Sequence, residues 1–251
     1  MNKYRYAVLL SLFCFLLNVK VTCTVDHMCA NQEEAIRMLG SESSFNFFSI
    51  NLSEIEKDDL NKLKLGVKEG SNAAMCNYNW PDPPHRIFSF LEALGNDHEL
   101  SQSVATTLKK IVDDIICVSG KKTAWVDISV WSVNDCFNIP RWHTDDYPNP
   151  PDGSFIYKVA VTLKGPCTLL YDLPENHREH FNKIRGIGTM EARQELVKLL
   201  NDSARVHVPP LYVGTAFIIG SLAAAKAKPA VHSEPRTDSE RIFISVIPMN
   251  P

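Results

Sequence analysis

The sequence predicts an α+β protein, an antiparallel β-sandwich or barrel with an N-terminal helical layer and one inserted helix. Apolar residues recur at helical spacing up to about residue 118, and from Thr123 the period changes from 3.6 to 2. Many short strand-like runs follow, which is typical of antiparallel sandwiches and barrels. The 251 residues are enough for one domain of this kind.

The first residues of the chain predict export. Lys3 and Arg5 precede an apolar run from Ala7 to Val19, and small residues follow up to Cys23. A basic head, a short apolar run and a small-residue cleavage site are the parts of a secretory signal. A membrane-spanning helix needs about 20 apolar residues, which is more than this run offers. We therefore expect residues 1–23 to be a signal peptide, with no stable membrane span after cleavage; an uncleaved N-terminal anchor is the alternative.

Export would place the seven cysteines in an oxidising compartment. Cys14 leaves with the signal, and cleavage after Cys23 leaves five cysteines. An odd set of this kind predicts two disulfides and one spare thiol, or fewer bridges. The five are Cys29, Cys76, Cys117, Cys136 and Cys167.

Residues 24–122 are expected to form a helical section that packs on the core. Its three predicted helices are Asn31–Leu39, a second from the capping box Ser53-x-x-Glu56 to about Leu65, and the clearest from about Leu100 to Val118. Gly120 ends the third helix. Residues 72–86 contain three prolines and are expected to be a loop.

Residues 123–251 are expected to form the β core. In the run TAWVDISVWSVN, apolar Val126, Ile128 and Val130 alternate with their neighbours, which predicts a half-buried strand. Further strands are predicted at FIYKVAVTL, CTLLYDL, ARVHVPP, LYVGTAFIIG and ERIFISVIP. The inserted helix is predicted at about Met190–Asn201, and NHREH before it is interpreted as a solvated turn.

A candidate metal site lies in this half of the chain. His143 and Asp145 are two residues apart, so both side chains point to one face of a strand. His232, before the last strand, supplies a third ligand. Two histidines and one carboxylate leave coordination positions open and suit non-haem Fe(II) oxygenases. A His-x-Asp motif alone is weak, and its position at a loop-to-strand junction strengthens it. His207 also lies in a strand and is interpreted as structural.

Two further residues are candidates for binding a co-substrate. Arg241 opens the last strand, and a guanidinium binds a carboxylate through two parallel hydrogen bonds. Arg236 is a competitor in a polar turn. Tyr157 and Lys158 point to opposite faces of the strand after the His-x-Asp loop. Tyr157 shares its face with apolar residues, so we expect it to face the pocket.

These residues together resemble the double-stranded β-helix (cupin-type) Fe(II)/2-oxoglutarate-dependent oxygenase superfamily. The resemblance rests on RWHTDD, AVHSEP and the arginine of ERIFISVIP, within about residues 123–250. It implies a jelly-roll fold, with Fe(II) held by His143, Asp145 and His232 and the far carboxylate of 2-oxoglutarate bound by Arg241. The implied reaction uses O2, usually to hydroxylate a substrate, here an unidentified small molecule or peptide.

Two other functions fit the same residues. One is a cupin-like protein that uses another divalent metal to activate water. The other is a non-catalytic exported β-sandwich binding module in which the His-x-Asp is accidental; it predicts that the three ligands lie far apart. The formal net charge of −3, without a Lys/Arg cluster, argues against nucleic-acid binding.

Overall fold

The structure of the chain is a computed structural model. It describes residues 27–250 except 42, 68–70, 72, 82–84, 134–137, 146, 148–154, 222–227 and 237. The predicted signal peptide therefore lies outside the described residues, and so does Cys136. Within the described part of the chain, no helix is both long and apolar enough to cross a bilayer.

Two antiparallel sheets form the β core. The larger has six strands in the order β1-β7-β4-β9-β3-β2, and the smaller has three in the order β6-β5-β8. The larger sheet consists of β1 (Phe45–Ser49), β2 (Ala73–Trp80), β3 (Thr123–Trp131), β4 (Phe155–Lys164), β7 (Val213–Ser221) and β9 (Arg241–Met249). The smaller consists of β5 (Leu169–Tyr171), β6 (Val206–His207) and β8 (Val231–Ser233).

The two sheets alternate along the chain. From β3 onward, the backbone passes to His143, which pairs with β8 of the smaller sheet, and returns to β4. It crosses again to β5 and β6, returns to β7, crosses to β8, and ends in β9 of the larger sheet. This winding is that of a double-stranded β-helix, so the predicted jelly-roll fold is confirmed.

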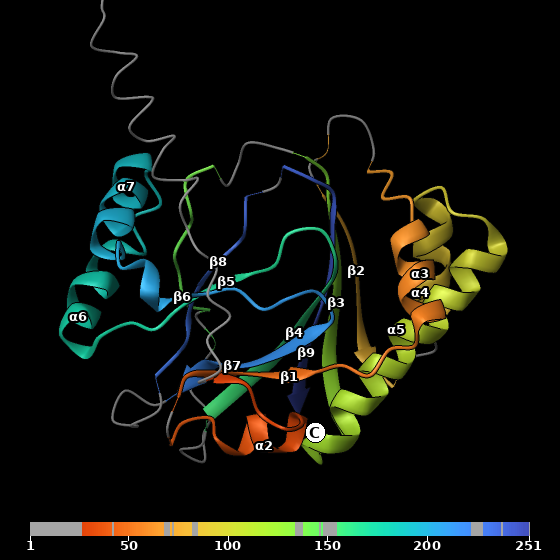
Figure 1. The fold of residues 1–251 in the computed structure, drawn as a ribbon, viewed down its shortest axis with the longest axis horizontal. Helices are drawn as coiled ribbons and strands as arrows, with labels where there is room; N and C mark the ends of the chain where they lie inside the picture. The colour runs from red at the N-terminus through yellow and green to blue at the C-terminus, as the bar shows by residue number, and fades with distance from the viewer. Residues whose placement is uncertain are drawn as a thin grey trace, which may run out of the picture.

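Helices cover one face of the larger sheet. They are α3 (Glu54–Lys62), α4 (His85–Ala93) and α5 (His98–Ser119), grouped on one side of the fold in Figure 1. The side chain of Asp97 accepts from the backbone N–H of Leu100 and caps α5 at its start. Gly120 ends α5 in the left-handed conformation, with φ of 64°. The long helix is therefore confirmed, within two residues at its start and one at its end.

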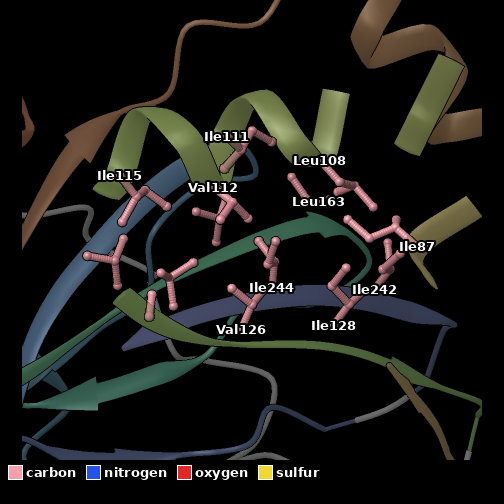
Figure 2. Packing of buried hydrophobic residues seen from close by; sticks show 14 of the residues in the cluster. Ile87, Leu108, Ile111, Val112, Ile115, Val126, Ile128, Leu163, Ile242 and Ile244 are labelled. Atoms are coloured by element: carbon pink, nitrogen blue, oxygen red, sulfur yellow. The ribbon is translucent and has the colours of Figure 1, made fainter. Parts of the chain in front are cut away.

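The core lies between α5 and this sheet. Figure 2 shows Leu108, Ile111, Val112 and Ile115 of α5 directed toward side chains of β3, β4 and β9. The strand residues there include Val126, Ile128, Leu163, Ile242 and Ile244, all buried to within 1% exposure. Burying such side chains stabilises a fold by about 1.5–3 kcal/mol each. The apolar face of each strand is thus the helix-facing one.

The opposite side of the molecule carries α6 (Glu175–Ile184) and α7 (Met190–Leu199), between β5 and β6 (Figure 1). Phe181 of α6 and Leu196 of α7 are buried in one cluster with Trp142, the residue before His143. The helix at 190–201 is confirmed. The solvated-turn interpretation of NHREH is wrong, because Phe181 and Ile184 anchor that segment as helix α6.

The N-terminal section also differs from the expectation. Within the segment 72–86, Ala73–Trp80 does not form the expected loop. It forms β2, which pairs antiparallel with β3 from the pair Ala73–Trp131 to the pair Trp80–Ala124. Phe45–Ser49 forms β1 and pairs with β7. Strands from both sides of residue 122 therefore share one sheet, with α2 (Gln32–Arg37) beside β1. The division into sections at residue 122 stays a prediction.

Three of the cysteines carry free thiols, namely Cys76, Cys117 and Cys167. They leave Cys29 and Cys136 of the five expected in the exported chain, so two disulfides cannot form. The reason is geometric, since Cys76 lies on β2 near the backbone of α4, Cys117 is exposed on α5, and Cys167 is buried before β5.

Candidate metal centre

His143, Asp145 and His232 lie together. One ligand atom from each falls within 4.8 Å of the others, and no other group of three or more His, Cys, Asp or Glu side chains among the described residues could hold a metal. Oδ1 of Asp145 lies 3.5 Å from Nε2 of His232 and 3.9 Å from Nε2 of His143. A metal about 2.1 Å from each ligand atom needs them about 3 Å apart, so small side-chain rotations suffice.

The backbone fixes the two histidines relative to each other. His143 and His232 form an antiparallel pair in which each N–H donates to the other's carbonyl oxygen at 2.9 Å. Their ring centroids are consequently 4.2 Å apart. Direct backbone pairing thus brings together two ligands that lie far apart in the sequence. The sequence alone does not show which strands pair.

The local hydrogen bonds set which ring nitrogen is free. Nδ1 of His143 lies 2.7 Å from the carbonyl oxygen of Arg141, and Nδ1 of His232 lies 3.2 Å from that of Ala230. A carbonyl only accepts, so each Nδ1 carries the proton and each Nε2 offers its lone pair toward Asp145. Metal-binding histidines in proteins are oriented in this way.

The electrostatics keep the ligands in their binding forms. Burial lowers the pKa of His143 to about 4, so the ring is neutral at pH 7. Burial acts to raise the pKa of Asp145. Interactions with His232 and Lys158 outweigh this effect and hold that pKa well below its usual range. A neutral imidazole and an ionised carboxylate are the forms that coordinate a cation.

The three candidate ligands line a pocket of about 220 Å³. Its floor is the face of the larger sheet opposite the helices. Residues from six strands line it, including Met75 of β2, Asp127 and Ser129 of β3, Lys158 of β4, Phe217 of β7, His232 of β8, and Arg241, Phe243 and Ser245 of β9. A larger groove of about 420 Å³ lies over α4 and α5, away from the metal ligands.

Arg241 lies in this pocket, as expected. Its side chain is 3% exposed, and Nη2 donates to Oγ1 of Thr168 at 2.7 Å. The buried Nε has no hydrogen-bond partner. Burial lowers the pKa of Arg241 to about 10, so the group is still charged at neutral pH. Glu234 interacts electrostatically with this cation, but the buried Nε donor still lacks an acceptor, whereas the competitor Arg236 is exposed.

The expectation for Tyr157 is wrong. Tyr157 is 7% exposed and packs in the core under the helices, where burial raises its pKa to about 12. Lys158 lines the pocket instead, and its Nζ lies 2.6 Å from Oδ2 of Asp145. The strand alternation was correct, but its apolar face packs on helices and its polar face lines the pocket.

Other candidate residues lie outside the pocket lining. His207 is buried on β6, with its ring 5.4 Å from that of Phe45. Trp142 packs against Tyr171 at 5.7 Å and supports the segment that carries His143. Two pocket residues were missed as functional candidates, Lys158 and Thr168. A lysine within an apolar strand run was the available signal for the first; Thr168 had none.

Several solved structures are similar to this chain. The dioxygenase for auxin oxidation 1 from Arabidopsis thaliana, in complex with 2-oxoglutarate, shares 11% identity at a TM-score of 0.43, over 87% of this chain and 88% of that one. The rice dioxygenase for auxin oxidation shares 10% at 0.46, over 87% and 78%. A Pseudomonas putida prolyl-4-hydroxylase shares 11% at 0.37, over 87% and 98%.

Sequence comparison adds nothing to these similarities. No protein-family model matches the chain, and no curated protein matches it by sequence. Any inference about function therefore rests on the side chains of the site.

Proposed function

We propose that this protein is an Fe(II)/2-oxoglutarate-dependent dioxygenase. The observation that carries the proposal is one pocket holding both a two-histidine, one-carboxylate ligand set and a buried arginine with a free donor. His143, Asp145 and His232 would hold the metal on one side and leave the other side open. Arg241 would bind the far carboxylate of 2-oxoglutarate.

The chain's own residues would orient the reactants and exclude water. The backbone pairing of His143 with His232 fixes the positions of two ligands in advance. This lowers the cost of reorganising the site when a metal binds. Arg241 and Thr168 offer a cation and a hydroxyl at the buried end of the pocket. Bound Fe(II), 2-oxoglutarate and O2 would supply the oxidising chemistry, typically substrate hydroxylation with succinate and CO2 as co-products.

The ligand geometry argues against the two alternatives in different ways. An accidental His-x-Asp in a binding module predicts ligands far apart, and they converge. A cupin that activates water with another metal requires no anion receptor, so it leaves the buried, unpaired Nε donor of Arg241 without a function.

The direct test adds Fe(II) and 2-oxoglutarate to the protein without oxygen and follows the weak visible absorption of the complex. The band is expected for the wild type and should be absent in His143→Ala. His98→Ala, an exposed histidine on α5, is the matched control and should keep the band. No band in the wild type, or an undiminished band in His143→Ala, would contradict the proposal.

A second pair of variants distinguishes metal binding from co-substrate binding. Arg241→Met should still bind Co(II) but lose affinity for 2-oxoglutarate, while Arg236→Met on the surface should behave as the wild type. Equal 2-oxoglutarate affinity in both variants would point instead to the cupin-type alternative.

We also propose that the protein is exported. The proposal rests on the basic and apolar pattern of residues 1–23. Mass spectrometry of the mature protein after expression in a secreting host should find an N-terminus near residue 24. A retained Met1 in a membrane fraction would indicate an anchor instead.

A further inference from the structure

Lys158 has no role in the proposed chemistry so far, yet it touches a metal ligand. Its Nζ lies 2.6 Å from Oδ2 of Asp145, while Oδ1 of the same carboxylate faces the two histidines. An ammonium–carboxylate contact at this distance is a strong, charge-assisted hydrogen bond. The two oxygens of Asp145 are thus directed to different partners.

The position of Lys158 is itself fixed. Its side chain is 15% exposed, and its ammonium lies 5.0 Å from the centre of the Phe217 ring. Lys158 and Phe217 are also register partners on β4 and β7. The same Phe217 ring lies 5.1 Å from the ring of His232. One aromatic side chain therefore supports both the third ligand and the lysine that contacts the second.

We propose that Lys158 is a positioning residue that makes Asp145 a one-oxygen ligand, and this inference rests on the proposed function. A carboxylate free to rotate can coordinate a metal through both oxygens and occupy two positions. Lys158 holds Oδ2 away from that arrangement. The position that Oδ2 would take stays available, and 2-oxoglutarate needs two open positions beside the one for O2.

The test uses Co(II) in place of Fe(II), since its visible bands weaken as the number of ligands rises. Lys158→Met keeps the length of the side chain and removes the charge. We expect it to bind Co(II) with an altered spectrum and to bind 2-oxoglutarate about tenfold to hundredfold more weakly, the usual effect of losing a residue that orients a ligand. Lys158→Arg, which keeps the charge, should restore both properties in large part.

Lys164→Met is the matched control. Lys164 lies on the same strand, but its ammonium donates to the backbone carbonyls of Asn61 and Leu63 under the helices. This variant should keep the wild-type spectrum and 2-oxoglutarate affinity. Thermal unfolding without metal identifies any variant that fails to fold. If Lys158→Met fails to fold, Lys158→Leu, which also removes the donor to Oδ2, takes its place in both measurements with the same expected result.

The outcomes separate this inference from the proposed function. A wild type that binds no Co(II) at a His143-dependent site would overturn the proposed function itself. A wild type that binds Co(II) and 2-oxoglutarate, with an unchanged spectrum and affinity in Lys158→Met, would overturn only the role of Lys158.

Discussion

The two faces of the larger sheet are built from the same strands and differ in almost every property. On β3 and β9, residues such as Val126, Ile128 and Ile244 are fully buried under α5. Their immediate neighbours Asp127 and Ser245 line the pocket. Strand alternation thus assigns stability to one face and chemistry to the other. Substitutions at adjacent positions should therefore have separable effects.

The largest effect is expected on the pocket side. Asp145→Asn should reduce Co(II) binding to background, because a neutral amide is a much poorer ligand than a carboxylate. The amide oxygen still accepts from Lys158, so the fold should be retained. Isothermal titration with Co(II) measures the loss, and circular dichroism without metal checks the fold. Wild-type Co(II) affinity in this variant would show that the metal site lies elsewhere.

On the helix side, Ile244→Ala should lower the free energy of unfolding by about 2–5 kcal/mol, because it leaves a cavity in the packed core. Ile244→Val is the matched smaller change, at about 0.5–1.5 kcal/mol. Urea unfolding measures both. Under native conditions each variant should bind Co(II) as the wild type does. A large change in Co(II) affinity would show that the two faces are coupled.

Thr168→Val tests the buried end of the pocket with a side chain of similar shape. It removes the acceptor of the Arg241 Nη2 hydrogen bond and leaves a second donor of a buried cation without a partner. We expect a loss of about 1.5–3 kcal/mol in unfolding free energy. Saturating 2-oxoglutarate should recover part of it, because an anion satisfies the guanidinium. No recovery would contradict the assignment of Arg241.

The smallest effect is expected for Asp127→Asn. Burial raises the pKa of Asp127, partly opposed by hydrogen bonding from Ser129. The folded protein therefore binds this proton more tightly than the unfolded chain, and the wild type loses stability as pH rises through the raised pKa. An asparagine side chain does not titrate, so the stability of Asp127→Asn relative to the wild type should increase between pH 4 and pH 7. A stability difference that does not change across that pH range would contradict the raised pKa of Asp127.

The same contrast explains which parts of the fold were predictable. The long helix and the core strands follow from apolar periodicity, which acts locally. Strand β2 was missed although buried Cys76 and Tyr78 alternate there with exposed residues, because the prolines, Asn and Asp of the segment favoured a loop. Helix α6 was missed for a related reason, since two buried residues in a polar segment hold it in place.

For the candidate site, residue type and spacing predicted that His143, Asp145, His232 and Arg241 belong together, and the structure brings them into one pocket. Tyr157 and Lys158 were assigned to the wrong faces because an apolar strand face was taken as the pocket face. When helices cover a sheet, the apolar face packs against them and the polar face is left for the site. A lysine opposite the apolar face of a strand is then the more informative signal.

The hydrogen-bonded pair of His143 and His232 has a consequence for folding. These residues become neighbours only when the strands between them have closed into the barrel, so the unfolded chain has no metal site. Metal binding would therefore report on completed folding, and a bound divalent ion should raise the melting temperature in proportion to the logarithm of its concentration. A metal bound at this site would stabilise the completed fold, and the rise in melting temperature would measure that stabilisation before any substrate is known.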